Sequence, residues 1–277
     1  MGLQIDYTPS SLFVHQTKYT LDLLHRFSRS DCKPCKTPCS LVAHLVANDS
    51  PLLVNHALYR SMVGALQYLT FARPDLSFAI QQACQFISPP TTNHLQAAKR
   101  ILRYLQGSLH QGLAFSPGPL TLSAYSDVDC AEEPMDRNSI SGILVFLGNS
   151  PITWSTKKQP TVSCSSTKTK YRALASSAIE LCWIRMLLKD FGVFLPSSPI
   201  LWCDNVFALA IASNHVFHAR TKYIEVDYYF VRERVLRHDL QVQFVASQDQ
   251  LVDILTKGIP SQFQWLVSKL MWHFSYI

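Results

Sequence analysis

The sequence lacks the features that mark a membrane-spanning or secreted chain. No apolar stretch approaches the roughly 18 to 20 residues needed to cross a bilayer. The first residues, Met-Gly-Leu-Gln-Ile-Asp, contain no charged segment followed by an apolar one. The eight cysteines are scattered, as reduced thiols of an intracellular protein are. We therefore expect an intracellular, non-secreted protein with no membrane partner.

Charged residues are few, at 16%, whereas hydrophobic residues make up 48% of the chain. This composition predicts a folded protein, because a disordered chain has too little apolar surface to offset its ordering entropy. A length of 277 residues suits two modest domains. The net charge of +6 favours an acidic partner, although the basic residues form no dense run.

The one cysteine cluster is Cys32, Cys35 and Cys39. Its spacing could begin a zinc site, but no second Cys/His pair follows at the distance seen in zinc fingers. We favour a proline-punctuated loop that carries incidental thiols.

Helical periodicity dominates the first region, for which we expect residues 1–115 to be mainly helical. A helix over 18–27 precedes a turn-rich loop over 30–56, which we expect to be exposed and mobile. Three further helices follow, and the last ends at Gly107. Should this region lack a packing partner, the apolar faces of 57–105 would be exposed and would promote self-association.

Alternating patterns begin after the break at 116–119, and a second domain is predicted over 116–277. The predicted strands are 120–124, 140–147, 152–156, 200–203 and 240–244. The predicted helices are 167–190, one around 224–235, and a terminal helix from Asp249. This order predicts an α/β fold, a mixed five-stranded sheet flanked by helices.

Lys99, Arg100 and Arg103 lie opposite the apolar stripe of the helix that ends at Gly107. They form a basic ridge that could follow a phosphate backbone. The alternative is an ordinary solvated helix face.

Three aspartates can converge in the second domain. Asp127 ends the first predicted strand, Asp204 follows the strand at 200–203, and Asp253 lies in the last helix. Ligands gather at strand ends of open α/β sheets, where carboxylates bind hard divalent cations. The alternatives are a helix N-cap for Asp204, a turn for Asp127 and a solvated Asp253.

Several motifs resemble one family, the Pol polyproteins of copia-type (Ty1/copia) retrotransposons. Three segments of this chain resemble the region just after the family's polymerase core: Tyr59–Thr70, Arg73–Asp75 and Ala98–Gly107. Five later segments resemble the family's ribonuclease H domain: Tyr125–Asp129, Trp154–Pro160, Trp202–Asn205, His218–Lys222 and Asp249–Lys257. The motifs run in the family's order from about Gln16 to Leu270.

The resemblance implies that 1–115 is a truncated reverse-transcriptase-derived region and 116–277 a ribonuclease H-like domain. The implied activity is two-metal hydrolysis of the RNA strand of RNA–DNA hybrids, with Mg²⁺ as cofactor. Asp127, Asp204 and Asp253 are the implied catalytic and metal-binding residues. No two aspartates are adjacent, so the polymerase motif Tyr-X-Asp-Asp is absent and a separate polymerase chain is an implied partner.

The sequence departs from the family at the start of the predicted helix over 167–190. Ser165-Ser-Thr-Lys-Thr-Lys-Tyr171 stands where the family has glutamates, so the fourth catalytic carboxylate falls on Lys170. At about 4 Å, a unit-charge interaction is worth roughly 4 kcal/mol even at an effective dielectric of 20. Lys170 is thus expected to neutralise Asp127 and Asp204 and block the metal; the alternative is that its side chain extends into solvent.

Three other departures are Cys130 for a tryptophan, Glu132 for a glycine and Tyr223 for a histidine, a drift typical of relaxed selection. We therefore expect a ribonuclease H with impaired catalysis. The alternatives are a folded relic without a partner and a catalytically dead remnant that binds nucleic acid. Its phosphate-binding residues would be Lys99, Arg100, Arg103, Lys157 and Lys158.

Overall fold

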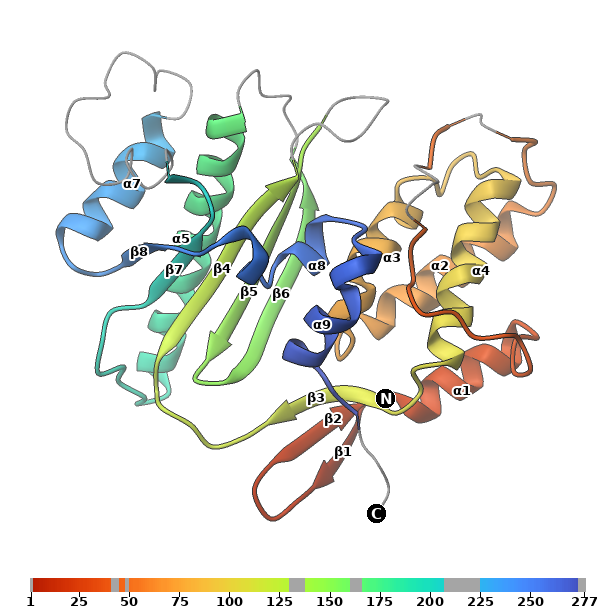
Figure 1. The fold of residues 1–277 in the computed structure, drawn as a ribbon, viewed down its shortest axis with the longest axis horizontal. Helices are drawn as coiled ribbons and strands as arrows, with labels where there is room; N and C mark the ends of the chain where they lie inside the picture. Colours follow the sequence, from red (N-terminus) through yellow and green to blue (C-terminus); the bar gives the residue numbers. More distant parts are fainter. Residues whose placement is uncertain are drawn as a thin grey trace. The chain divides into compact units, whose positions relative to one another are not determined.

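The computed structural model describes residues 2–40, 45–47, 50–129, 138–159, 166–206 and 225–273. The chain divides into two compact units (Figure 1). Unit 1 comprises Met1–Ser116 and Lys257–Ile277, and unit 2 comprises residues 117–256. In sequence, unit 2 is therefore an insertion within unit 1.

Unit 1 contains the helices expected from the periodicity. They are α1 (Thr17–Arg26), α2 (His56–Leu69), α3 (Ser77–Cys84), α4 (Thr92–Gln106) and α9 (Pro260–Leu270). The Asn55 side chain caps α2 by accepting the Leu58 N–H at 3.0 Å. The apolar faces of α2 and α4 are buried, Leu66 and Leu105 completely. These faces are therefore largely covered within unit 1, although Leu58 near the start of α2 is 42% exposed.

Unit 1 also contains a four-stranded antiparallel sheet that the sequence analysis missed. Its order is β1 (Gln4–Tyr7), β2 (Leu12–His15), β3 (Gln111–Phe115) and β9 (Trp272–His273). A Cβ added at Gly112 of β3 would lie 2.5 Å from the Val14 carbonyl oxygen. Only a glycine allows these two strands to approach so closely.

The described part of the loop predicted over 30–56 contains neither a helix nor a strand before α2 begins at His56, but it is hydrogen-bonded to its surroundings. The Leu53 N–H donates to the Pro90 carbonyl at 3.0 Å, and the Cys35 N–H donates to the Arg103 carbonyl at 3.2 Å. Thr37 is buried. The expectation of an exposed connector is therefore wrong at Thr37.

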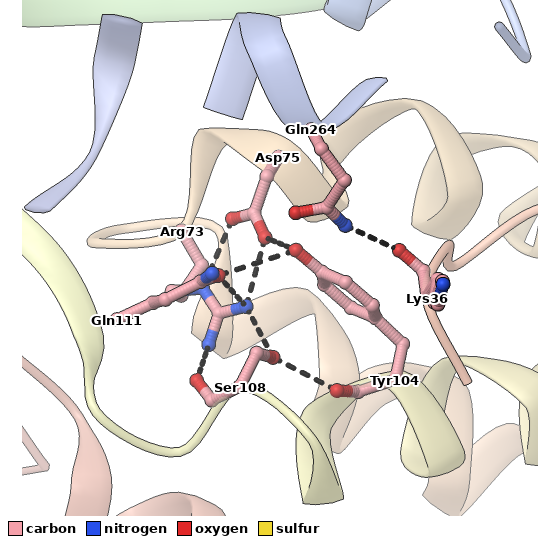
Figure 2. Close-up of polar contacts among 7 residues, drawn as sticks. All are labelled: Lys36, Arg73, Asp75, Tyr104, Ser108, Gln111 and Gln264. Atoms are coloured by element: carbon pink, nitrogen blue, oxygen red, sulfur yellow. Dashed lines mark hydrogen bonds and ion pairs between the residues drawn. The ribbon is translucent and has the colours of Figure 1, made fainter. Parts of the chain in front are cut away.

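A buried polar network joins α4 to the turn before α3 (Figure 2). The Arg73 guanidinium donates to both oxygens of Asp75, at 3.0 and 2.8 Å, and to the Ser108 carbonyl at 2.9 Å. The Tyr104 hydroxyl donates to Asp75 Oδ2 at 2.7 Å, and Gln111 Oε1 accepts from Arg73 and Tyr104. Because the charges of Arg73 and Asp75 are paired and hydrogen-bonded, both can be fully buried. The motif Arg73–Asp75 is thus structural here.

Burial shifts the ionisation of this network. It raises the pKa of Tyr104 well above its usual value, and the Asp75 charge raises it further. Burial alone would lower the pKa of Arg73, but the Asp75 carboxylate outweighs burial and raises it. The network is therefore held in one ionic form, with Tyr104 neutral and Arg73 charged.

The last described residues pack within unit 1. Strand β9 pairs with β3, Phe263 of α9 lies edge-on to Tyr104 with ring centroids 5.6 Å apart, and Gln264 Nε2 donates to the Lys36 carbonyl at 2.6 Å. The sequence analysis placed these residues in the second domain, over 116–277. The structure groups them with unit 1 instead, and the predicted terminal helix is divided into short α8 (Asp253–Thr256) and α9.

Unit 2 is built on the predicted mixed five-stranded sheet. The strands are β4 (Leu122–Asp129), β5 (Ile140–Leu147), β6 (Ser150–Lys158), β7 (Ile200–Cys203) and β8 (Gln241–Phe244). Their order is β6-β5-β4-β7-β8, with β6, β5 and β4 antiparallel and β4, β7 and β8 parallel. The predicted α/β fold class, a mixed five-stranded sheet flanked by helices, is thereby confirmed.

Helices α5 (Ser166–Asp190) and α7 (Glu225–Leu236) flank this sheet. Tyr171, Leu174, Ala178 and Leu181 recur at three- and four-residue intervals on α5 and join the core that includes Leu201. Within the described residues, no helix is long and apolar enough to cross a membrane.

Helix α5 ends in a Schellman motif. The Gly192 N–H donates to the Lys189 carbonyl at 2.9 Å, and the Val193 N–H donates to the Leu188 carbonyl at 2.8 Å. Gly192 has a φ of 76°, a left-handed conformation that costs glycine little. The helix therefore stops at a defined point.

Candidate functional site

Two of the predicted aspartates meet at one end of the sheet. Strands β4 and β7 run parallel, with Ser126 of β4 beside Cys203 of β7. Asp127 and Asp204 are the residues that follow this pair, Asp127 within β4 and Asp204 directly after β7. The Asp127 side chain is fully buried and that of Asp204 is 7% exposed. The convergence follows from the parallel strands, whose carboxyl ends share an edge.

Helix α5, which packs against β4, adds an ammonium to this pair of carboxylates. Lys170 Nζ lies 2.9 Å from Asp204 Oδ1 and 3.4 Å from Asp127 Oδ1. The Lys170 side chain is only 19% exposed, so it does not extend into solvent. The predicted contact with both aspartates is therefore present.

The environment favours the charged form of Lys170. Burial alone would lower the pKa of Lys170, but the hydrogen bond to Asp204 and the charges of both aspartates outweigh burial and raise it. The site thus holds a permanent cation in contact with two carboxylates.

The third predicted aspartate, Asp253, begins α8 and is buried. On the same short helix, Thr256 Oγ1 donates to Asp127 Oδ2 at 3.4 Å. A Cβ added at Gly142 of β5 would lie 2.6 Å from Thr256 Cγ2, so this glycine lets α8 pack directly on the sheet. Thr256 and Gly142 were missed by the sequence analysis, although Thr256 lies within the motif Asp249–Lys257.

These residues do not fit a divalent metal ion as they stand. Within the described part of the chain, no three His, Cys, Asp or Glu side chains are grouped so that they could hold one. Lys170 Nζ contacts the two carboxylates that would serve as oxygen ligands. No hydrolytic step through Mg²⁺ follows from this arrangement.

The proposed phosphate-binding arginines of α4 have other contacts. Arg100 Nη2 donates to Thr37 Oγ1 at 2.9 Å, and Arg103 Nε donates to the Lys33 carbonyl at 2.9 Å. Both arginines thus fasten the loop over 30–56 to α4. Lys99 is half-buried on the same helix.

Lys157 and Lys158 lie at the end of the edge strand β6. Lys157 is exposed and Lys158 is half-buried. Of the five residues proposed to bind phosphate, Lys157 is thus the most accessible. Cys130, Glu132, Tyr223 and the motif His218–Lys222 lie outside the described residues.

Comparison with known proteins places the chain among transposon polyproteins. It is 42% identical over 272 residues to the retrovirus-related Pol polyprotein from transposon RE1 of Arabidopsis thaliana, covering 98% of this chain and 19% of that protein. It is 43% identical over 260 residues to the corresponding polyprotein from transposon RE2, covering 94% and 18%. The chain spans about a fifth of the length of these relatives. No protein-family model matches it.

Solved structures with some likeness include LC11-RNase H1 in complex with an RNA/DNA hybrid. That match has 10% identity and a TM-score of 0.39, and covers 51% of this chain and 98% of the other. A foamy viral protease-reverse transcriptase in complex with an RNA/DNA hybrid has 10% identity and a TM-score of 0.43, covering 88% and 29%.

The matches to RE1 and RE2 extend over 98% and 94% of the chain. The mixed sheet of unit 2 has the architecture that the ribonuclease H motifs of the sequence imply. This chain belongs to the Pol polyproteins of copia-type retrotransposons and corresponds to a segment of about a fifth of their length.

Proposed function

We propose that unit 2 is a ribonuclease H-type domain in which the Lys170 ammonium takes the place of a metal ion. Its substrate would be the RNA strand of an RNA–DNA hybrid, and its hydrolysis is impaired. The observation that supports this proposal is the contact of Lys170 Nζ with Asp204 and Asp127, at 2.9 and 3.4 Å.

Electrostatics explain why the ammonium opposes a metal. A divalent cation that reached Asp127 and Asp204 would meet a positive charge within contact distance. At about 4 Å and an effective dielectric near 20, each pair of unit charges repels by roughly 4 kcal/mol. Asp127, Asp204 and Asp253, the proposed metal ligands, therefore serve here as partners of a lysine and as packing residues.

Cleavage of a labelled RNA–DNA hybrid in Mg²⁺ tests the proposal. We expect no cleavage by the natural chain, measurable cleavage after Lys170→Glu, and none after Lys170→Glu combined with Asp127→Asn, because the double variant again lacks a ligand. Magnesium-dependent cleavage by the natural chain that disappears with Asp127→Asn would contradict the blocking role of Lys170.

Metal binding provides a readout that does not depend on activity. Lys170→Glu should gain a Mg²⁺-dependent increase in melting temperature, since ligands that bind the folded state stabilise it. Lys189→Glu, at an exposed position of the same helix, is the matched control and should not respond. A natural chain that Mg²⁺ stabilises as much as it stabilises Lys170→Glu would contradict the proposal.

A second candidate function is binding of a hybrid without cleavage, favoured by the net charge of +6 and the exposure of Lys157. Affinity should fall as salt rises, because bound phosphates release counterions. Lys157→Glu should weaken binding and reduce the salt slope by about 1. A separate polymerase chain is a further proposed partner, to be tested by co-purification with a reverse transcriptase that has Tyr-X-Asp-Asp.

A further inference from the structure

The net positive charge of the chain is carried by unit 1. Residues 1–116 and 257–277 contain 12 lysines and arginines against five aspartates, a net charge of +7. Residues 117–256 contain 13 against 14 acidic residues, a net charge of −1, which together with unit 1 gives the +6 of the chain. An acidic partner is therefore attracted to unit 1 rather than to unit 2.

Three elements without any acidic residue lie together in unit 1. They are the loop residues 32–40, helix α4 and helix α9. Arg103 Nε of α4 donates to the Lys33 carbonyl at 2.9 Å, and Gln264 Nε2 of α9 donates to the Lys36 carbonyl at 2.6 Å (Figure 2). The loop thus contacts both helices, so the cations of all three elements are neighbours.

We call this region the α4–α9 basic surface, and its members are Lys33, Lys36, Lys99, Arg103, Lys269 and the aromatic Trp265. Lys33, Lys36 and Lys269 are exposed, whereas Lys99 and Arg103 are half-buried. Among the residues that the structure describes, none of these five cations is paired with a carboxylate. Their charge is therefore available to an anion outside the chain.

The neighbouring polar groups do not offset this charge. Arg100 of α4 adds a further guanidinium, which donates to the uncharged Thr37 hydroxyl at 2.9 Å. Burial raises the pKa of the Cys35 and Cys39 thiols, that of Cys39 to about 12, and outweighs the opposing charge of Arg100. The two thiols are uncharged at neutral pH, so the surface stays strongly positive.

Trp265 adds an aromatic ring to the α4–α9 basic surface. The residue is 40% exposed, and Lys269 Nζ lies 5.7 Å from the centroid of its ring. An exposed ring beside a cation suits a single-stranded nucleic acid, because an unpaired base can stack on the ring while a phosphate pairs with the cation. Bases inside a duplex are already stacked on one another, so a duplex would use only the charges.

We propose that the α4–α9 basic surface binds single-stranded nucleic acid, with phosphates on Lys33, Lys36 and Lys269 and a base on Trp265. This site is separate from the hybrid site proposed for unit 2, because none of its residues belongs to residues 117–256. Charge and stacking provide the binding, and neither depends strongly on the base sequence.

Fluorescence anisotropy of a labelled oligothymidine of about 20 nucleotides, measured on the full chain without Mg²⁺, tests the proposal. Trp265→Ala should raise the dissociation constant at least about fivefold, because a base loses its stacking partner. Trp183→Ala, at an exposed tryptophan of unit 2, is the matched control and should bind as the natural chain does. Absence of binding at low salt, or an unchanged affinity in a folded Trp265→Ala variant, would overturn the proposal.

A charge variant tests the phosphate contacts without altering a packed residue. Lys33→Gln combined with Lys36→Gln should reduce the slope of log affinity against log salt by about 1.4, the value for two contacts to a single strand. Lys18→Gln combined with Lys189→Gln removes the same charge at exposed positions elsewhere and should leave the slope unchanged. Equal slopes in the two double variants would overturn the assignment of the phosphates.

Other partners would give different results. An oligothymidine–oligoadenine duplex of the same length that binds as tightly as the single strand would overturn the single-strand assignment. Vesicles containing phosphatidylserine that bind the chain, while the oligothymidine does not, would assign the surface to a membrane and overturn the proposal. Because neither hybrid nor Mg²⁺ is present, none of these results depends on cleavage by unit 2.

Discussion

The contact of Lys170 with Asp127 and Asp204 makes unit 2 sensitive to one substitution. Lys170→Met keeps most of the side-chain volume but leaves two buried carboxylates without their cation. Removing one partner of a buried ion pair costs about 3 kcal/mol or more. We expect that loss in urea unfolding at neutral pH, against less than about 0.5 kcal/mol for exposed Lys189→Met. Equal stability of the two variants would show that the contact contributes little.

In unit 1, the hydroxyl of Tyr104 should matter more than that of Tyr59. Tyr104 donates to the Asp75 carboxylate, whereas Tyr59 donates to the neutral Ala83 carbonyl at 2.8 Å. Hydrogen bonds to charged groups contribute about 1.5–3 kcal/mol and neutral ones about 1 kcal/mol. Tyr104→Phe should therefore destabilise unit 1 more than Tyr59→Phe does in thermal unfolding.

The contribution of the Tyr104 hydroxyl to stability should depend on pH. Because the pKa of Tyr104 is raised in the folded state, its stabilising contribution is complete below the unfolded value of about 10 and is lost as pH rises further. The stability difference between the natural chain and Tyr104→Phe should shrink between about pH 9 and pH 11. A difference that grows over this interval would contradict a neutral, buried Tyr104.

At the scale of single residues, the contact of Lys170 with Asp127 and Asp204 could be predicted, because local patterns place the aspartates at strand ends and the family resemblance places Lys170 at the position of a fourth carboxylate. Arg73 and Ser108 could not be paired from the sequence, since 35 residues separate them and only the packing of α4 brings them together. Thr256 was missed for the same reason: its contact with Asp127 spans 129 residues.

At the scale of elements, the end of α5 depends on one glycine. Gly192→Ala places a Cβ on a residue with a φ of 76°, which costs roughly 1–2 kcal/mol even though no atom lies within 4 Å of that Cβ. Gly64, inside α2 and also without neighbours within 4 Å of an added Cβ, is the control. Gly64→Ala should instead stabilise by about 0.4–1 kcal/mol, and differential scanning calorimetry would distinguish the two signs.

The sequence pattern predicted α5 and the strands of unit 2, including the four-residue β7 and β8, but none of the strands of unit 1. Helix α5 and strand β5 were predicted close to their full lengths, and β6 was predicted over its central residues. Strands β1, β2 and β9 have four residues or fewer and lie where the sequence analysis expected helices. The sheet of unit 1 exists because β3 holds both β2 and β9, a pairing that no local pattern encodes.

At the scale of the whole molecule, unit 1 needs residues from both sides of unit 2. A chain ending at residue 256 would lose α9 and β9, and with them the contacts of Phe263 with Tyr104 and of Gln264 with Lys36. We expect amide hydrogen exchange to accelerate in β3 and α4 of this variant, whereas amides of β4 and β5 keep their rates. Unchanged exchange in β3 would contradict the assignment of residues 257–273 to unit 1.

The insertion also has a mechanical consequence. The chain enters unit 1 at β1 and leaves it at β9, and both strands belong to the same sheet. A pulling force applied between residues 2 and 273 would first load that sheet, and tension would reach β4 to β8 only after β9 had separated from β3. Unit 1 would thus bear the force first and protect the inserted unit from being unfolded by it.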